Sequence, residues 1–210
     1  MVKVPLLIKK FFYNQIWEFP NNDNKIYLTF DDGPTPEVTE WVLDLLKKEN
    51  IKATFFCIGN NIEKYPGIFS KTIEASHSIG NHTFNHLQGW KTSTKEYIEN
   101  IDLCSSIIQK SAINNEQSTI FRPPYGKIKP KQSRLLRNKD FKIIMWDVLS
   151  KDYDLSVTKE DCLKNVVNNT QSGSIIVFHD SVKALQNLKF ALPKAIKILK
   201  EKGFVFDTIN

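Results

Sequence analysis

Three of the four histidines in this chain stand beside other polar residues in patterns suited to holding a metal ion and moving protons. His82 and His86 are four residues apart, and adjacent carboxylates occur at Asp31 and Asp32. Two imidazoles with this spacing share one face of a helix, so we expect His82 and His86 to bind one ion together. Asp32 is the predicted third ligand, because two histidines and one carboxylate leave coordination positions free for water and substrate.

The same donor set holds zinc in hydrolases and ferrous iron in oxygenases, so the ligand types alone leave both chemistries open. Zinc is the first prediction, and cobalt or another divalent ion fits the same donors. Asp31 is the predicted base, since one carboxylate of an acidic pair can bind the ion while the other accepts a proton from water. Taken alone, Asp-Asp-Gly is an ordinary turn, and the remaining histidine, His77, is expected to be a hydrogen-bonded core residue.

The elements that must position these residues alternate between strand-like and helix-like segments. Seven strands are predicted, at 26–30, 53–58, a short segment ending near 80, 119–121, 142–148, 174–179 and 204–208. Helices are predicted between them, from 38 to about 50 and at 65–75, 94–111, 130–138, 158–170 and 183–200. Repeated strand–helix units imply parallel strands with right-handed crossovers, in an open sheet or a barrel.

Polar residues follow these strands at their carboxyl ends. They are Asp31 and Asp32 after the first strand, His82 and His86 after the third, Arg122 after the fourth, Asp147 and Asp152 after the fifth, and His179 at the end of the sixth. Sites of barrel enzymes and open α/β sheets assemble on this face, so these residues should converge. For Asp147 we expect only a surface ion pair.

Composition favours a single domain over residues 1–210, with 1–24 as an N-terminal helical extension. The formal charge of +6 favours approach to anionic surfaces, but no nucleic-acid module is recognised, and no nucleic-acid partner is predicted. Lys9 and Lys10 interrupt the apolar start of the chain, so neither a signal peptide nor a membrane span is predicted, and the default localisation is cytoplasmic. The first helix should pack on the barrel, with peripheral contact to a membrane surface as the alternative.

Tryptophans and cysteines give weaker signals. Trp41 and Trp146 fall on apolar patterns and are expected in the core, whereas Trp90 follows His86 in an irregular stretch where it could contact a sugar. The three cysteines are widely spaced and are expected to be reduced structural thiols.

Five ordered motifs between Thr29 and His179 resemble those of the polysaccharide deacetylases with a NodB homology domain, carbohydrate esterase family four. TFDDGP at 29–34, HTFNH at 82–86 and RPPYG at 122–126 are intact. Asp152-Tyr153 stands where the family has Asp-Trp, and Val177-Phe178-His179 stands where it has Leu-x-His.

The resemblance implies a distorted seven-stranded (β/α) barrel and metal-dependent removal of N-acetyl groups from a GlcNAc-containing polysaccharide or oligosaccharide, peptidoglycan or chitin-like. It implies that Asp32, His82 and His86 hold the ion, Asp31 is the base and Arg122 orients it. It also implies that His179 is the acid, Asp152 pairs with it, and the Tyr125 backbone N–H stabilises the oxyanion. Tyr153 and Val177 replace residues that wall the acetyl-methyl pocket in the family. An O-acetyl esterase acting on xylan and a catalytically silent sugar-binding protein are the alternatives.

Overall fold

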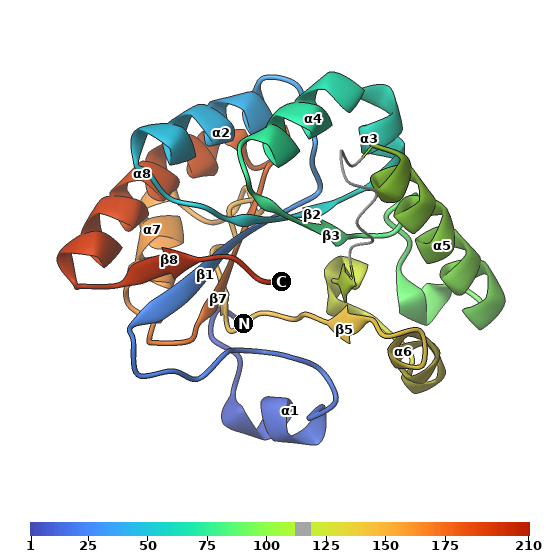
Figure 1. The fold of residues 1–210 in the computed structure, drawn as a ribbon. Coiled ribbons are helices and arrows are strands. Elements are labelled where there is room, and N and C mark those ends of the chain that lie inside the picture. The colour runs from blue at the N-terminus through green and yellow to red at the C-terminus, as the bar shows by residue number, and fades with distance from the viewer. Residues whose placement is uncertain (112–118) are drawn as a thin grey trace.

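Parallel strands form one curled sheet at the centre of the molecule, with most helices packed on its outside (Figure 1). The computed structural model describes residues 1–111 and 119–210. The strands are β1 Lys25–Asp31, β2 Thr54–Cys57, β3 Ser78–Asn81, β4 Ile120–Phe121, β5 Lys142–Ile143, β6 Val148–Leu149, β7 Ile175–His179 and β8 Val205–Asp207. Their order is β5-β4-β3-β2-β1-β7-β6, with β8 beside β1.

Each of the seven predicted strands has a counterpart, and the predicted strand 142–148 is divided into β5 and β6. β5 pairs with β4 and β6 pairs with β7, so this divided strand links the two edges of the sheet and curls it. The predicted distorted seven-stranded barrel is therefore confirmed. The break has a physical cause, because the carbonyls of Ile144 and Met145 accept hydrogen bonds from the buried Arg122 guanidinium.

The helices are α1 Leu6–Phe11, α2 Val38–Lys48, α3 Gly59–Lys64, α4 Pro66–Glu74, α5 Thr94–Ser111, α6 Pro130–Arg137, α7 Lys159–Val167 and α8 Leu185–Glu201. All six predicted helices are present. The short α3 was not predicted, since Gly-Asn-Asn is typical of a turn. Tertiary contacts fix its start: Gly59 N–H donates to the Thr83 carbonyl and Asn60 N–H to the Phe84 carbonyl. Within the two described ranges, no helix is long and apolar enough to cross a membrane.

Alternation along β1 separates the core from the site. Ile26, Leu28 and Phe30 point to the helix-covered side, where Phe30 stacks on Phe55 with ring centroids 5.0 Å apart. Each fully buried side chain of this size stabilises the fold by about 1.5–3 kcal/mol. Thr29 and the residue two positions later, Asp31, point to the opposite side, into the barrel. The hydrophobic pattern of β1 thus fixes which way Asp31 faces.

The N-terminal extension is helical only in α1, a turn at residues 12–14 follows it, and isolated β-bridges hold the extension against the barrel. Isolated bridges join Lys3 to Val148, Ile16 to Ile144 and Glu18 to Ser174. At these bridges, backbone groups of the extension and of the barrel strands satisfy one another's hydrogen bonds.

The expected surface ion pair at Asp147 is wrong. The Asp147 side chain is fully buried and accepts hydrogen bonds from Lys3, from Lys9 at 2.6 Å and from the Ser174 hydroxyl at 2.6 Å. The N-terminal segment covers this carboxylate and supplies both lysines, which sequence spacing alone does not reveal.

Candidate metal and catalytic site

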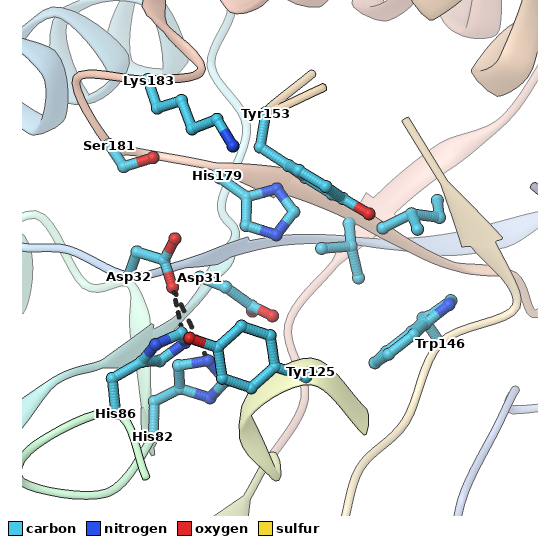
Figure 2. A pocket seen from close by; sticks show the side chains of 12 residues that line it. Asp31, Asp32, His82, His86, Tyr125, Trp146, Tyr153, His179, Ser181 and Lys183 are labelled. Carbon is cyan, nitrogen blue, oxygen red and sulfur yellow. Dashed lines mark ion pairs between the residues drawn. The ribbon is translucent and has the colours of Figure 1, made fainter. Parts of the chain in front are cut away.

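The carboxyl ends of the strands open into one pocket of about 470 Å³ (Figure 2). Its lining consists of Asp31, Asp32, His82, His86, Tyr125, Trp146, Leu149, Tyr153, Val177, His179, Ser181 and Lys183. Arg122 and Asp152 lie fully buried behind this lining. The structure therefore brings together the predicted site residues except Trp90, although they span nearly 150 positions of the sequence.

Asp32, His82 and His86 form a cluster whose potential ligand atoms all lie within 4.8 Å of one another. Asp32 Oδ1 is 3.2 Å from His86 Nε2 and 3.8 Å from His82 Nε2. In a tetrahedral zinc site, donors about 2.1 Å from the metal lie roughly 3.4 Å apart. The three side chains therefore fit a divalent metal with only small movements.

A hydrogen bond to the other ring nitrogen orients His82 so that its Nε2 could bind a metal ion. Its Nδ1 lies 2.7 Å from the Arg122 carbonyl oxygen, so Nδ1–H donates to that carbonyl and Nε2 keeps its lone pair toward Asp32. Burial lowers the pKa of His82 to about 4, which keeps the ring neutral near pH 7. Burial by itself would raise the pKa of the Asp32 carboxyl. The hydrogen bond from His86 and the nearby His179 outweigh burial and hold this pKa well below its usual range.

The prediction that His82 and His86 share one face of a helix is wrong, although they do converge. The segment is a loop in which Thr83 and His86 have φ values of 64° and 54°. Asn81 Oδ1 accepts the Thr83 N–H at 2.8 Å, and Asn100 Oδ1 accepts the Phe84 N–H at 2.8 Å. These side-chain amides accept the backbone N–H groups that a helix would pair internally, and they hold the loop in its strained conformation.

Asp31 is oriented by a buried arginine. Arg122 Nη1 donates to Asp31 Oδ1 and to the Thr29 hydroxyl, both at 2.7 Å, and its Nη2 donates to the Met145 carbonyl at 2.9 Å. The guanidinium also lies 4.0 Å from the centroid of the Phe56 ring. Because Arg122 occupies Oδ1, Asp31 has Oδ2 left to meet a molecule in the pocket.

His179 and Asp152 form a second charged pair on the other side of the pocket. Asp152 Oδ1 lies 2.7 Å from His179 Nδ1, and Asp152 Oδ2 accepts the His179 backbone N–H at 2.8 Å. Burial opposes protonation of the ring, but the Asp152 carboxylate outweighs it and raises the pKa of His179 to about 9. His179 is therefore protonated near pH 7, with Nε2–H as its remaining donor.

Two tyrosines flank these groups. The Tyr125 ring centroid lies 4.7 Å from that of His86, and the Tyr153 ring meets His179 edge-on at 4.8 Å (Figure 2). Tyr125 has a φ of 60°, in the left-handed region that few non-glycine residues adopt. The Asp31 carboxylate, the His179 imidazolium and the three potential metal ligands thus surround one space between the rings of Tyr125 and Tyr153.

A model of the family described as polysaccharide deacetylase matches residues 19–144. The chain belongs to the polysaccharide deacetylase family. A peptidoglycan-N-acetylglucosamine deacetylase of Bacillus cereus is 37% identical over 198 residues, which are 94% of this chain and 71% of the relative. Chitin deacetylase 2 of Saccharomyces cerevisiae is 33% identical over 179 residues, 82% of this chain and 55% of the relative.

A solved structure of a peptidoglycan N-acetylglucosamine deacetylase has the same fold. It is 36% identical and superposes with a TM-score of 0.89, covering 98% of this chain and 95% of that one. Because the superposition covers 98% of this chain, most of the N-terminal extension has a counterpart in that structure.

Two tryptophans of this polysaccharide deacetylase lie in or beside the pocket. Trp146 packs against the core, as expected, and it also lines the pocket beside the break between β5 and β6. Trp90 is 55% exposed and lines a neighbouring cavity instead, with its Nε1–H donating to the Ile128 carbonyl at 3.0 Å. Trp41 packs against the core as expected.

The sequence patterns assign no role to Asp180, although it directly follows His179. It is buried, and its carboxylate accepts the Gly33 N–H at 3.0 Å and the Thr39 hydroxyl at 2.6 Å. Burial raises the pKa of Asp180 to about 7. Ser181 and Lys183, at the pocket rim, were also not predicted; their place just after a strand that ends in His179 was the available signal.

His77 agrees with the prediction of an ordinary buried histidine. Its Nδ1 accepts the Ala53 N–H at 3.2 Å, and burial lowers its pKa to about 4. The three cysteines are buried and free, as expected.

Proposed function

We propose that this polysaccharide deacetylase removes N-acetyl groups from GlcNAc-containing glycans by metal-dependent hydrolysis, with peptidoglycan strands as the substrate. The observation that carries the proposal is a single pocket with a base–arginine pair on one side, an acid–carboxylate pair on the other and three metal donors between them. The relative with 37% identity is named for peptidoglycan, which favours this glycan over chitin.

Asp32, His82 and His86 would hold the ion, and zinc is the proposed metal because its tetrahedral site with one open position matches three protein donors. When bound, a divalent cation polarises the acetyl carbonyl and makes water in the pocket more acidic.

Asp31 is the proposed base. Its free Oδ2 accepts the proton of the attacking water, while the hydrogen bond from Arg122 to Oδ1 holds the carboxylate in place. The Tyr125 backbone N–H is proposed to stabilise the oxyanion that forms at the acetyl carbonyl.

His179 is the proposed acid. Its Nε2–H delivers a proton to the departing sugar amine as the carbon–nitrogen bond breaks, and Asp152 stabilises the imidazolium before that transfer. The products are acetate and a free amino sugar.

Tyr153 and Val177 are proposed to wall the acetyl group, because both line the pocket close to His179. Trp90 is proposed as a contact for a sugar beyond the one that reacts, since its exposed ring lies outside the catalytic pocket.

Acetate release from defined substrates tests the function. Purified protein is treated with a chelator, restored with zinc or cobalt, and assayed on GlcNAc oligosaccharides, peptidoglycan fragments and acetylated xylan. We expect metal-restored acetate release from the two GlcNAc substrates. Release from xylan alone would indicate an O-acetyl esterase, and sugar binding without release from any substrate would indicate a silent binding protein; either result rejects the proposal.

Peripheral membrane contact by the N-terminal segment is a separate proposal, supported by exposed apolar side chains on and beside α1. Leu7, Phe11 and Tyr13 are 81%, 78% and 76% exposed, and Lys10 is exposed next to them. Co-sedimentation with anionic vesicles tests it. Sedimentation that is unchanged in Phe11→Ser would reject this contact.

A further inference from the structure

A second cavity, of about 290 Å³, lies between the N-terminal segment and the barrel. The N-terminal segment contributes Ile8, Phe12 and Trp17 to one wall, and the barrel contributes Trp90 and Ile128 to the other. We refer to this cavity as the N-terminal groove. The family motifs do not include the residues of its N-terminal wall.

The N-terminal groove adjoins the catalytic pocket, because Tyr125 and Trp146 line both. Tyr125 is 58% exposed, and its ring also contacts His86 on the pocket side. A ligand with a reacting group at the metal cradle can therefore extend past these two rings into the groove.

The groove wall is fixed in place rather than loosely attached. Ile16 N–H donates to the Ile143 carbonyl at 2.8 Å, and Met145 N–H donates to the Ile16 carbonyl at 2.7 Å. The indole N–H of Trp17 donates to the Phe12 carbonyl at 3.2 Å. Because the protein itself supplies these contacts, binding in the groove needs little further ordering of the N-terminal segment.

The chemistry of the lining points to the faces of sugar rings. Exposed aromatic surface is offered by Trp90 and by Phe12, which is 41% exposed. Of the described side chains that line the groove, Lys127 is the charged one, and its Nζ lies 4.0 Å from the Trp90 ring centroid. Aromatic rings accept the apolar C–H faces of pyranoses, whereas such a lining gives little to an ionic ligand.

We propose that the N-terminal groove binds a further sugar of the same glycan strand whose neighbouring N-acetyl group occupies the catalytic pocket. This inference rests on the proposed function for its substrate class. It assigns the N-terminal segment a part in substrate binding, and it requires that longer oligosaccharides bind more tightly than short ones.

Two adjacent phenylalanines provide a matched test, since Phe12 lines the groove and Phe11 does not. Binding of the GlcNAc pentamer and dimer is measured by calorimetry, and kcat/KM for acetate release is measured for both in the metal-loaded protein. We expect Phe12→Ala to reduce the pentamer-to-dimer ratio of affinity and of kcat/KM by roughly fivefold, mainly through KM. Phe11→Ala should keep both ratios.

Trp90→Ala is the second groove variant, used if Phe12→Ala lowers the melting temperature strongly. The proposal that the groove binds a sugar is rejected if the pentamer-to-dimer ratios of the folded groove variants match wild type. It is also rejected if these ratios fall equally in Phe11→Ala. Absence of acetate release from either oligosaccharide rejects the proposed function, whereas a pentamer affinity that Phe12→Ala selectively lowers still supports the groove. The two failures are therefore distinguishable.

Discussion

At the residue scale, the adjacent carboxylates Asp31 and Asp32 differ because their partners differ. Arg122 bonds Asp31 on one oxygen, whereas Asp32 faces the two imidazoles His82 and His86. One carboxylate is therefore held ready to accept a proton, and the other is placed to bind a cation. The same argument separates His82, neutral because it is buried, from His179, which is charged because Asp152 is beside it.

Asp31→Asn should abolish deacetylation while keeping the metal. The amide cannot accept the proton of water, so we expect a fall in kcat of about 10²–10⁴-fold. The three potential ligands are unchanged, so zinc content measured by mass spectrometry of the metal should equal that of wild type. Wild-type turnover in this variant would reject Asp31 as the base.

Asp152→Asn should move the alkaline limit of activity to lower pH. The carboxylate raises the pKa of His179 to about 9, so the proposed acid is protonated below that pH, and activity should fall as pH rises through it. Without the negative charge, the pKa of His179 falls toward its ordinary value, and the alkaline limb of the kcat profile should shift down by roughly two pH units.

Asp154→Asn is the control for this profile, since Asp154 is an exposed carboxylate bonded to Ser156 rather than to His179. An alkaline limb that stays in place in Asp152→Asn, or moves equally in both variants, would contradict the pairing of Asp152 with the acid.

At the element scale, the loop after β1 depends on a close approach to the loop after β7. A Cβ at Gly33 would lie 1.9 Å from Asp180 Oδ2, and Asp180 in turn accepts the Gly33 N–H. The adjacent Asp32 has a φ of 84°. The absence of a side chain at Gly33 therefore lets two loops set the position of Asp32, one of the three potential metal ligands.

Gly33→Ala should destabilise the protein and weaken metal binding together. The added methyl must displace the buried Asp180 carboxylate, at a cost of about 1–3 kcal/mol in the free energy of unfolding. Urea unfolding and zinc titration measure the two effects. Gly67→Ala is the matched control, because its added Cβ meets nothing within 4 Å and α4 should gain up to about 1 kcal/mol. Equal stability in the two variants would contradict the close approach.

At the scale of the whole molecule, the N-terminal segment is held on the barrel by the buried Asp147. Lys3 and Lys9 reach this carboxylate from the segment, Ser174 reaches it from the barrel, and Lys9 also pairs with Glu18. The same segment bridges the region between β5 and β6, where Trp146 turns into the pocket. Attachment of the segment and the shape of the pocket are thus linked.

Asp147→Ala should release the N-terminal segment. Removal of a buried carboxylate that pairs with two lysines should cost on the order of 3 kcal/mol in the free energy of unfolding. Limited proteolysis should then cut within residues 1–20 before the barrel is degraded. Asp102→Ala, which breaks an exposed pair with Lys139, should cost less than about 1 kcal/mol and leave proteolysis unchanged. Protection of the segment in Asp147→Ala would show that other contacts hold it.

Sequence patterns alone predict every strand, all helices but α3, the family resemblance and the polar residues at strand ends. These signals are short in range: the period of a strand or helix, a turn residue, or a motif of about five positions. They even identified His82 and His86 as a pair, although through a helix that does not exist.

Four features require the folded structure: the burial of Asp147, the position of Trp146 in the pocket lining, the hydrogen bond from Gly33 to Asp180 and the path of the N-terminal segment. The contacts at Asp147, at Gly33 and along the N-terminal segment join groups more than 100 residues apart, whereas the break beside Trp146 depends on Arg122, 22 to 23 positions away. Local patterns carry no information on which distant group covers a charge or replaces a ladder hydrogen bond. The folded chain settles these points because every buried polar group must find a partner, wherever in the sequence that partner lies.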